Sequence, residues 1–177
     1  MKKILALVFL LFFITNPAFG LKVKVQDASG SVGESIRVPI LVEDAKNLGS
    51  MDVVITYDLA ILKVKSVGKG ELNKGLISSN TKEVEGKGII SIAIADSRGI
   101  NGSGEIAVIT FEGLKEGSSE IVIQGVRAHD VETHLDIGAD VQDGKLTVTG
   151  KKTPGFEIFL AAVSLIVLAF VSRKLRE

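Results

Sequence analysis

The sequence predicts an all-β protein: an antiparallel jelly-roll β-sandwich of about nine strands, flanked by a signal peptide and a C-terminal apolar segment. Two patterns carry this prediction. Apolar residues recur at every second position through most of the chain, which is the period of a strand with one buried face. Glycine pairs and polar clusters separate the alternating stretches, so turns rather than crossover helices should connect them.

Clean alternation places the strands along the chain. The alternating segments are residues 21–26, 36–42, 51–57, 62–67, 88–95, 105–111, 120–123 and 145–148. Turns are expected in the glycine-rich or polar segments at 30–33, 68–70, 86–88, 99–104 and 116–119. Only residues 58–62 could form a short helical turn. Many short strands without intervening helices favour a sandwich whose core is built from one face of each strand.

The N-terminus has the three parts of a secretory signal peptide, residues 1–20. Two lysines precede an apolar stretch at 4–14, and Ala18 and Gly20 place small residues at the −3 and −1 positions of a cleavage site. Leu21 is therefore the expected mature N-terminus of an exported protein.

The C-terminus predicts attachment to a membrane. Residues 151–156 form a short linker with a Pro-Gly-Phe motif, residues 157–171 a hydrophobic segment, and residues 172–177 a basic tail. The apolar run from Ile158 to Val171 covers 14 residues, or about 21 Å of helix, against the ~30 Å hydrocarbon core of a bilayer. With the basic tail inside the cell, the domain before it lies outside.

Residues 21–150 are long enough for one domain, since a chain of this length buries roughly two thirds of its unfolded surface. The chain has no cysteine, so disulfides, cysteine-based metal sites and thiol catalysis are excluded. The domain holds 14 basic and 19 acidic residues, a net charge of about −5. An acidic domain without a basic patch argues against nucleic acid as a partner.

One cluster of side chains could serve an enzyme or a metal. Its members are His129, Asp130, Glu132, His134 and Asp136. In an extended strand the last four would share a face, and imidazoles with carboxylates can bind zinc or calcium. The spacing matches no hydrolytic motif, and the chain has no Gly-x-Ser-x-Gly elbow, His-Glu-x-x-His helix or phosphate loop. We therefore expect no enzyme, no catalytic residue and no metal site, and interpret the cluster as a solvated acidic segment near a sheet edge.

Five segments carry a family resemblance. They are residues 30–40 (GSVGESIRVPI), 47–58 (NLGSMDVVITYD), 88–96 (GIISIAIAD), 104–111 (GEIAVITF) and 141–148 (VQDGKLTV). Together they resemble the cohesin family over nearly all of the domain. The resemblance implies a nine-stranded jelly-roll sandwich that binds the calcium-loaded dockerin module of another protein. It also implies that this chain needs no cofactor of its own, because the calcium belongs to the dockerin.

The candidate partner-binding residues lie on the outer faces of two predicted strands. They are Ser50, Asp52, Val54 and Thr56 of the first strand and Ser91, Ala93 and Ala95 of the second. Outward positions that alternate with an apolar face and carry small side chains let a partner pack at low entropy cost. The cohesin resemblance places the two strands side by side in the sheet that receives dockerin, with Ser50 and Asp52 at polar contact positions. Ser50 replaces the asparagine common there, and Ala95 stands where family members often carry an acid.

Two motifs indicate processing outside the cell. Pro154, Gly155 and Phe156, followed by a short apolar run and basic residues, resemble the sorting signal that archaeosortases process, which implies a lipid-anchored protein on an archaeal cell surface. A retained membrane tail is the alternative. Asn101-Gly102-Ser103 is a sequon in a glycine-rich segment, which makes Asn101 a candidate glycosylation site.

A carbohydrate-binding module or an adhesin of the same architecture is the alternative function. Sugar-binding surfaces usually stack aromatic rings on the sugar, but the aromatic residues between 21 and 150 are Tyr57 and Phe111 alone, both at core-facing positions. Carbohydrate is therefore disfavoured as a partner. The sequence predicts a cell-surface cohesin, attached to the membrane through its C-terminus, that docks a dockerin-bearing extracellular protein.

Overall fold

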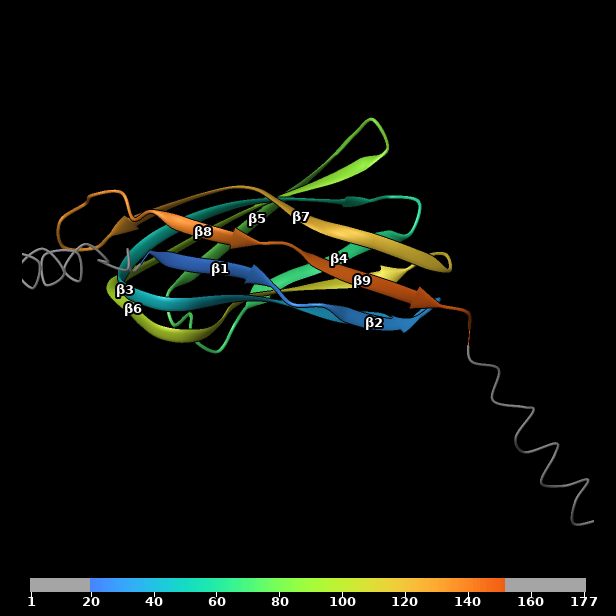
Figure 1. Cartoon of the computed structure of the whole chain (residues 1–177), viewed down its shortest axis with the longest axis horizontal. Coiled ribbons are helices and arrows are strands. Elements are labelled where there is room, and N and C mark those ends of the chain that lie inside the picture. Colours follow the sequence, from blue (N-terminus) through green and yellow to red (C-terminus); the bar gives the residue numbers. More distant parts are fainter. Residues whose placement is uncertain (1–19, 152–177) are drawn as a thin grey trace, which may run out of the picture.

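The computed structural model describes residues 20–151, and nine β-strands without a helix make up this part of the chain (Figure 1). The strands are β1 (Leu21–Val25), β2 (Ala28–Ser31), β3 (Ser35–Asp58), β4 (Leu62–Lys69), β5 (Leu76–Val84), β6 (Lys87–Gly113), β7 (Gly117–Asp130), β8 (Ala139–Gln142) and β9 (Gly144–Thr149). The predicted signal peptide up to residue 19, the sorting motif, the hydrophobic segment and the basic tail lie outside the described residues. Within residues 20–151 there is no helix that could cross a membrane.

The two longest strands, β3 and β6, form the frame of the fold. They contain 24 and 27 residues and pair antiparallel from Ser35 to Asp58 of β3, with register shifts between Ile40 and Ser50. Bulges of this kind bend a strand and increase its twist. Figure 1 shows both strands curling over one end of the domain. As a result, the N-terminal half of β3 pairs with β1, whereas its C-terminal half pairs with β7.

The curl divides one hydrogen-bonded sheet into two packed layers. One layer contains β4, the second half of β6, the first half of β3, β1 and β8. The other contains β5, the first half of β6, the second half of β3 and β7, and the N-terminal part of β7 continues through β9 to β2. The predicted all-β sandwich is therefore confirmed.

Antiparallel pairing throughout, however, is wrong at two places. β1 pairs parallel with β8, and β2 pairs parallel with β9. A short hairpin loop imposes antiparallel pairing only on the strands that it joins. β1 and β2 lie near the start of the described chain and β8 and β9 near its end, so no short loop joins the paired strands and they can run in the same direction.

Three strands are not predicted by the alternation: β2, β5 and β8. β2 and β8 have only four residues each, and β2 takes in Gly30 and Ser31, where the glycine pattern predicts a turn. In β5 every side chain except Ile77 is exposed, so both of its faces carry polar residues and no apolar period can arise. A strand without one apolar face lacks the two-residue apolar period by which strands are found in a sequence.

Two expected turns also differ from the structure. The glycine-rich segment 99–104 lies within β6, where Gly99 and Gly102 adopt φ angles of 74° and 99° and help to bend the strand. The segment 58–62, which could have been a helical turn, is a turn between β3 and β4. There the Ile61 N–H donates to the carbonyl of Asp58 at 3.3 Å.

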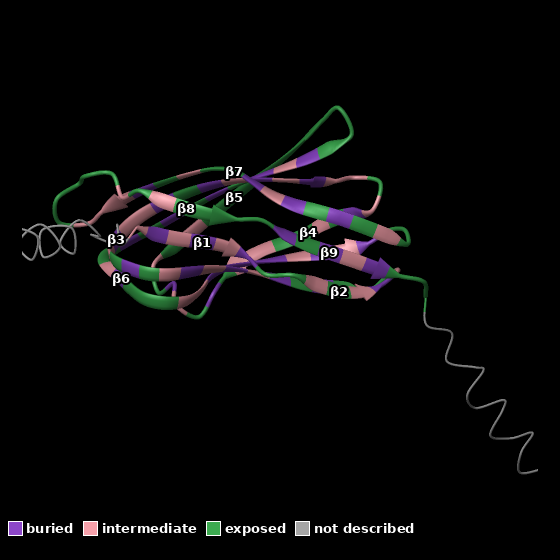
Figure 2. Ribbon diagram, in the orientation of Figure 1, coloured by how far each residue is buried: buried purple, intermediate pink, exposed green. Residues whose placement is uncertain are grey.

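The core lies between the two layers and confirms which face of each predicted strand is buried. Met51, Val53, Ile55 and Tyr57 of β3 and Ile90, Ile92 and Ile94 of β6 are all at most 4% exposed. Figure 2 shows the alternation of buried and exposed residues along the strands. Tyr57 packs edge-on against Phe111, with ring centroids 5.1 Å apart. A close-packed inner face of this kind holds the outer faces of β3 and β6 rigid.

Candidate functional site

The structure brings the predicted partner-binding residues together on one outer face. In the β3–β6 ladder, Ser50 lies opposite Ala95, Asp52 opposite Ala93, and Val54 opposite Ser91. Directly opposed residues of an antiparallel pair point to the same side of a sheet. We call the outer face of the four strands β7–β3–β6–β5 the platform. Whether it binds a partner stays a prediction at this point.

The platform is lined by short side chains. Asp52, Ser91, Ala93 and Ala95 are exposed, and Val54 is half-buried. Its middle forms a shallow groove of about 670 Å³. The outward-facing residues of this groove are Asp52, Val54, Ser78, Asn80, Ser91, Ala93, Gln124, Gly125 and Arg127. Apart from Gln124 and Arg127 these side chains are short, so an element of another protein can approach the centre of the groove with few long side chains to order.

β5 supplies one side of the platform, which the sequence analysis missed. Leu76 lies opposite Ala95, Ser78 opposite Ala93, and Asn80 opposite Ser91. Leu76 is 73% exposed and is therefore an apolar side chain available to a partner. Ser78 and Asn80 on one face and Ser79 and Thr81 on the other leave no apolar period, which is why the sequence did not reveal this strand.

β7 supplies the other side, which the sequence analysis also missed. His129 lies opposite Ser50, Arg127 opposite Asp52, and Gly125 opposite Val54. A register shift lies between Ile123 and Gly125, and the Gln124 amide there donates a hydrogen bond to the Thr56 hydroxyl at 3.0 Å. The Gln-Gly pair interrupts the apolar alternation, so the sequence predicted the strand only up to residue 123.

Two charges of opposite sign, Asp52 and Arg127, line the groove. Asp52 and Arg127 are both exposed and occupy opposed positions on β3 and β7. Among the described residues, neither side chain makes an ion pair or a hydrogen bond. Both charges are therefore available to a partner that brings the complementary groups.

At one end of the platform His129 joins two side chains. Its Nδ1 lies 3.3 Å from the Ser50 hydroxyl, and its Nε2 lies 3.1 Å from a carboxylate oxygen of Asp136. Serine, histidine and aspartate are also the members of a hydrolytic triad, in which a buried carboxylate orients the imidazole. Here the Asp136 side chain is 92% exposed, so water competes for it. The arrangement is better suited to fixing the orientation of Ser50 than to catalysis.

The common face imagined for Asp130, Glu132, His134 and Asp136 does not form. β7 ends at Asp130, whose carboxylate accepts the backbone N–H groups of Glu132 and Thr133, each at 2.8 Å. His134 adopts a φ of 59°, so the chain turns instead of extending. The hydrogen bond from Thr133, and then that from Glu132, lowers the pKa of Asp130 below its ordinary value. Within residues 20–151 no group of three or more side chains is placed to hold a metal ion.

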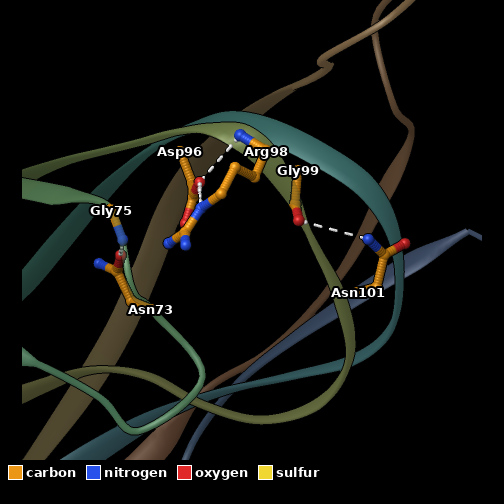
Figure 3. Close-up of polar contacts among 6 residues, drawn as sticks. All are labelled: Asn73, Gly75, Asp96, Arg98, Gly99 and Asn101. Carbon is orange, nitrogen blue, oxygen red and sulfur yellow. Dashed lines mark hydrogen bonds and ion pairs between the residues drawn. The ribbon is translucent and has the colours of Figure 1, made fainter.

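A second set of polar contacts lies beside the platform, in the β4–β5 connection and in β6 (Figure 3). The Asp96 carboxylate, only 6% exposed, accepts the Arg98 backbone N–H at 2.9 Å and lies 3.4 Å from the Arg98 Nε. That backbone hydrogen bond, opposed by burial, lowers the pKa of Asp96. The Asn73 side chain accepts the Gly75 N–H at 2.9 Å. The Asn73 contact shapes the turn that leads into β5, and Leu76, the first residue of β5, lies opposite Ala95, next to Asp96 in β6.

The candidate glycosylation site lies outside the platform. Asn101 is exposed within β6, and its side-chain amide donates to the Gly99 carbonyl at 3.3 Å (Figure 3). Its carbonyl oxygen accepts the Asn47 N–H at 2.9 Å, and Asn47 itself has a φ of 48°. The side chain therefore supports the bend of β3, and its glycosylation stays a prediction.

Solved structures with the same fold include several domains of one family. A non-cellulosomal cohesin from the hyperthermophilic archaeon Archaeoglobus fulgidus is 23% identical, with 75% of this chain and 94% of that chain covered and a TM-score of 0.64. The cohesin CaCohA2 from Clostridium acetobutylicum is 26% identical, with 73% and 91% covered and a TM-score of 0.62. In its complex with a variant of CaDoc0917 it is again 26% identical, with 73% and 99% covered and a TM-score of 0.65.

A further similar structure is a type I cohesin–dockerin complex, Coh-OlpA-Doc918, from Clostridium thermocellum. It is 20% identical, with 73% of this chain and 99% of that chain covered and a TM-score of 0.66. No curated protein matches the chain by sequence. The model of the family described as "Cohesin domain" matches residues 21–148, which is nearly the whole described domain. This chain therefore belongs to the cohesin domain family.

Proposed function

We propose that this chain is a non-enzymatic docking module whose platform binds the calcium-loaded dockerin of an extracellular partner, while the C-terminus holds the module at the cell surface. The observation that carries the proposal is the shallow groove over β7, β3, β6 and β5, with small side chains at its centre and, on one side, two charges that the described residues leave unpaired. Complexes of other cohesins with dockerins support it.

The contact surface suits a protein partner for a physical reason. Ala93 lies between Asp52 of β3 and Ser78 of β5, so the centre of the face carries no long side chain. A partner can therefore approach the sheet closely, and most of the affinity should come from packing around this centre. A hydrogen bond to the Asp52 carboxylate would be charge-assisted, worth about 1.5–3 kcal/mol, and would select partners that offer a matching donor.

The tether is inferred from the sequence. The signal peptide predicts export, and the Pro154-Gly155-Phe156 motif with its short apolar run predicts attachment at the C-terminus. Only Lys151–Thr153 separate the domain from that motif. Because this linker is so short, the docked partner would lie close to the membrane.

Calorimetric titration with a calcium-loaded dockerin from the same genome tests the docking proposal. Ala93→Arg should abolish binding, because an arginine at the centre of the face would have to be desolvated without a partner. Ser29→Arg, an exposed position on the edge strand β2 away from the platform, is the matched control and should bind as the wild type does. A calcium chelator should remove binding without lowering the melting temperature of the cohesin.

The thermal melts of the two arginine variants complete the test. Both should match the wild type, since both substitutions lie on exposed positions. Unchanged affinity of Ala93→Arg with an unchanged melt would show that the platform is not the docking face. An anchored carbohydrate-binding or adhesin-type sandwich without a dockerin partner would then become the leading function.

A further inference from the structure

The free edge of β5 is unusually open for a natural sheet. Among the described strands β5 pairs with β6 alone, through a ladder of nine residues without a register shift. Proteins usually block such an edge with proline, a bulge, an inward charge or a covering segment, because unpaired backbone groups invite another strand. β5 contains no proline, and its two charges, Lys82 and Glu83, lie near its C-terminal end, so residues 76–81 are uncharged. Figures 1 and 2 show the β5–β6 hairpin projecting from the body of the domain, exposed along β5.

The two ends of β5 carry exposed apolar side chains. Leu76 is 73% exposed and Val84 is 49% exposed. They are eight residues apart, so they lie on the same face of the strand, which is the face of the platform. Asn80 stands midway between them. This symmetric placement makes the edge complementary to a second copy of itself.

We propose that two copies of this chain pair antiparallel through β5, around a two-fold axis at Asn80. In this register Leu76 of each copy lies opposite Val84 of the other. The two-fold symmetry gives this apolar contact at both ends of the paired strands. Ser78 lies opposite Lys82, and Ile77 lies opposite Glu83, so no like charges are opposed. The contact is isologous, as expected for a closed dimer.

Neighbouring registers are worse for specific reasons. An axis at Ser79 leaves Val84 without a partner, and an axis at Thr81 leaves Leu76 without one. An axis at Lys82 places two ammonium groups opposite each other, which is destabilising. If the pairing were shifted by a single residue, the platform of one copy would lie on the opposite side of the joined sheet from the platform of the other.

The dimer would double the docking face. Across the axis the strand order would be β7–β3–β6–β5 in one copy followed by β5–β6–β3–β7 in the other. Eight strands would then form one sheet, with both platforms on the same side. Pairing uses the backbone edge of β5 and leaves the groove open. If each platform binds a dockerin as proposed above, the pair would be bivalent, but the pairing itself does not depend on any dockerin.

Single-cysteine cross-linking tests the register on the full chain in isolated membranes. The chain has no native cysteine, so Asn80→Cys introduces the sole thiol. Opposed residues in an antiparallel ladder have Cα atoms ~4.5–5.5 Å apart, within disulfide range. In the matched control Lys82→Cys the two thiols would stand four residues apart, or about 13 Å, which is too far. With diamide as oxidant and without dockerin, Asn80→Cys should form disulfide dimer about ten-fold faster than Lys82→Cys.

A second pair of variants connects the cross-link to the apolar contacts. Val84→Lys in the Asn80→Cys background should lose the dimer, whereas Val84→Leu should keep it. Equal cross-linking of Asn80→Cys and Lys82→Cys, or none in either, would overturn the β5 pairing. Insensitivity to Val84→Lys would do the same. None of these outcomes bears on dockerin binding, which Ala93→Arg tests separately.

Discussion

Asp52 and Arg127 stand directly opposite each other on β3 and β7, yet no ion pair joins them. Opposed charges in an antiparallel ladder usually contribute roughly 0.2–1 kcal/mol when they pair. Leaving them apart forgoes that small gain and keeps both charges free on the side of the groove. If the platform docks a partner as proposed, that partner can satisfy both groups at once.

Replacing Asp52 by alanine should weaken dockerin binding about 5- to 150-fold, the equivalent of ~1–3 kcal/mol, because a buried charge-assisted hydrogen bond is lost. Calorimetry with the calcium-loaded dockerin measures the effect. Asp140→Ala removes the same charge from β8 in the other layer and should leave the affinity unchanged. Equal losses in the two variants would mean that overall charge, and not a local contact, decides the affinity.

A substitution one position away from the platform should affect stability instead. Ile92 is 2% exposed and lies directly beneath the groove. Ile92→Ala should lower the free energy of unfolding by about 2–5 kcal/mol, because it leaves a cavity in a packed core. Urea denaturation compares it with Asp52→Ala, which should unfold like the wild type. A small effect at Ile92 would indicate that the inner face is loosely packed.

The two faces of β3 and β6 were predictable because side chains alternate strictly along a strand. One apolar period in residues 51–57 and another in 88–95 sufficed to separate the core from the platform, and the structure confirms both. That these two strands are neighbours could be expected only through the cohesin resemblance, since a period does not say which strands pair, and the register that puts Asp52 opposite Ala93 came only from the structure.

Other parts of the site could not be predicted, for reasons that lie in individual residues. β5 lacks an apolar period because Ser79 and Thr81, which point toward the inner side, are exposed beyond the core. Gly125 breaks the pattern of β7, which conceals Arg127 and His129. The turn after Asp130 depends on hydrogen bonds that its own carboxylate accepts, so residues 130–136 do not take the extended form that would align their side chains on one face.

Gly75 should be intolerant of a side chain. A Cβ at this position would overlap the backbone oxygen of Ala95 and lie 2.8 Å from the Asp96 Cα. Because backbone cannot move aside easily, Gly75→Ala should cost roughly 1–3 kcal/mol of stability and displace Leu76 at the edge of the platform. Gly68→Ala is the matched control, since nothing lies within 4 Å of its Cβ position. Thermal melts that coincide for the two variants would contradict this account.

Asp96 should make the domain sensitive to acid. Its pKa in the folded protein is lowered, first by the Arg98 N–H, so the folded state holds the proton less tightly than the unfolded state, whose ordinary value is 3.8. The resulting stability is fully present above that value and is lost as the pH falls through the lowered pKa. Asp96→Asn should therefore be less stable than the wild type near about pH 7, and the gap should narrow near about pH 3. A gap that is equal at both values would show that the charge of Asp96 is not responsible.

The C-terminal tail should be absent from the mature protein. Its apolar run of 14 residues spans about 21 Å, short of the ~30 Å that a stable helix needs in a bilayer, which suits a signal that is held briefly and then removed. Intact-mass measurement of membrane-extracted protein should give a chain that ends near Pro154-Gly155-Phe156 and carries a lipid. Gly155→Ala should retain the tail if this motif directs the cut. Peptides containing Phe170 or Arg173 in the mature surface pool of the wild type would instead establish a retained membrane tail.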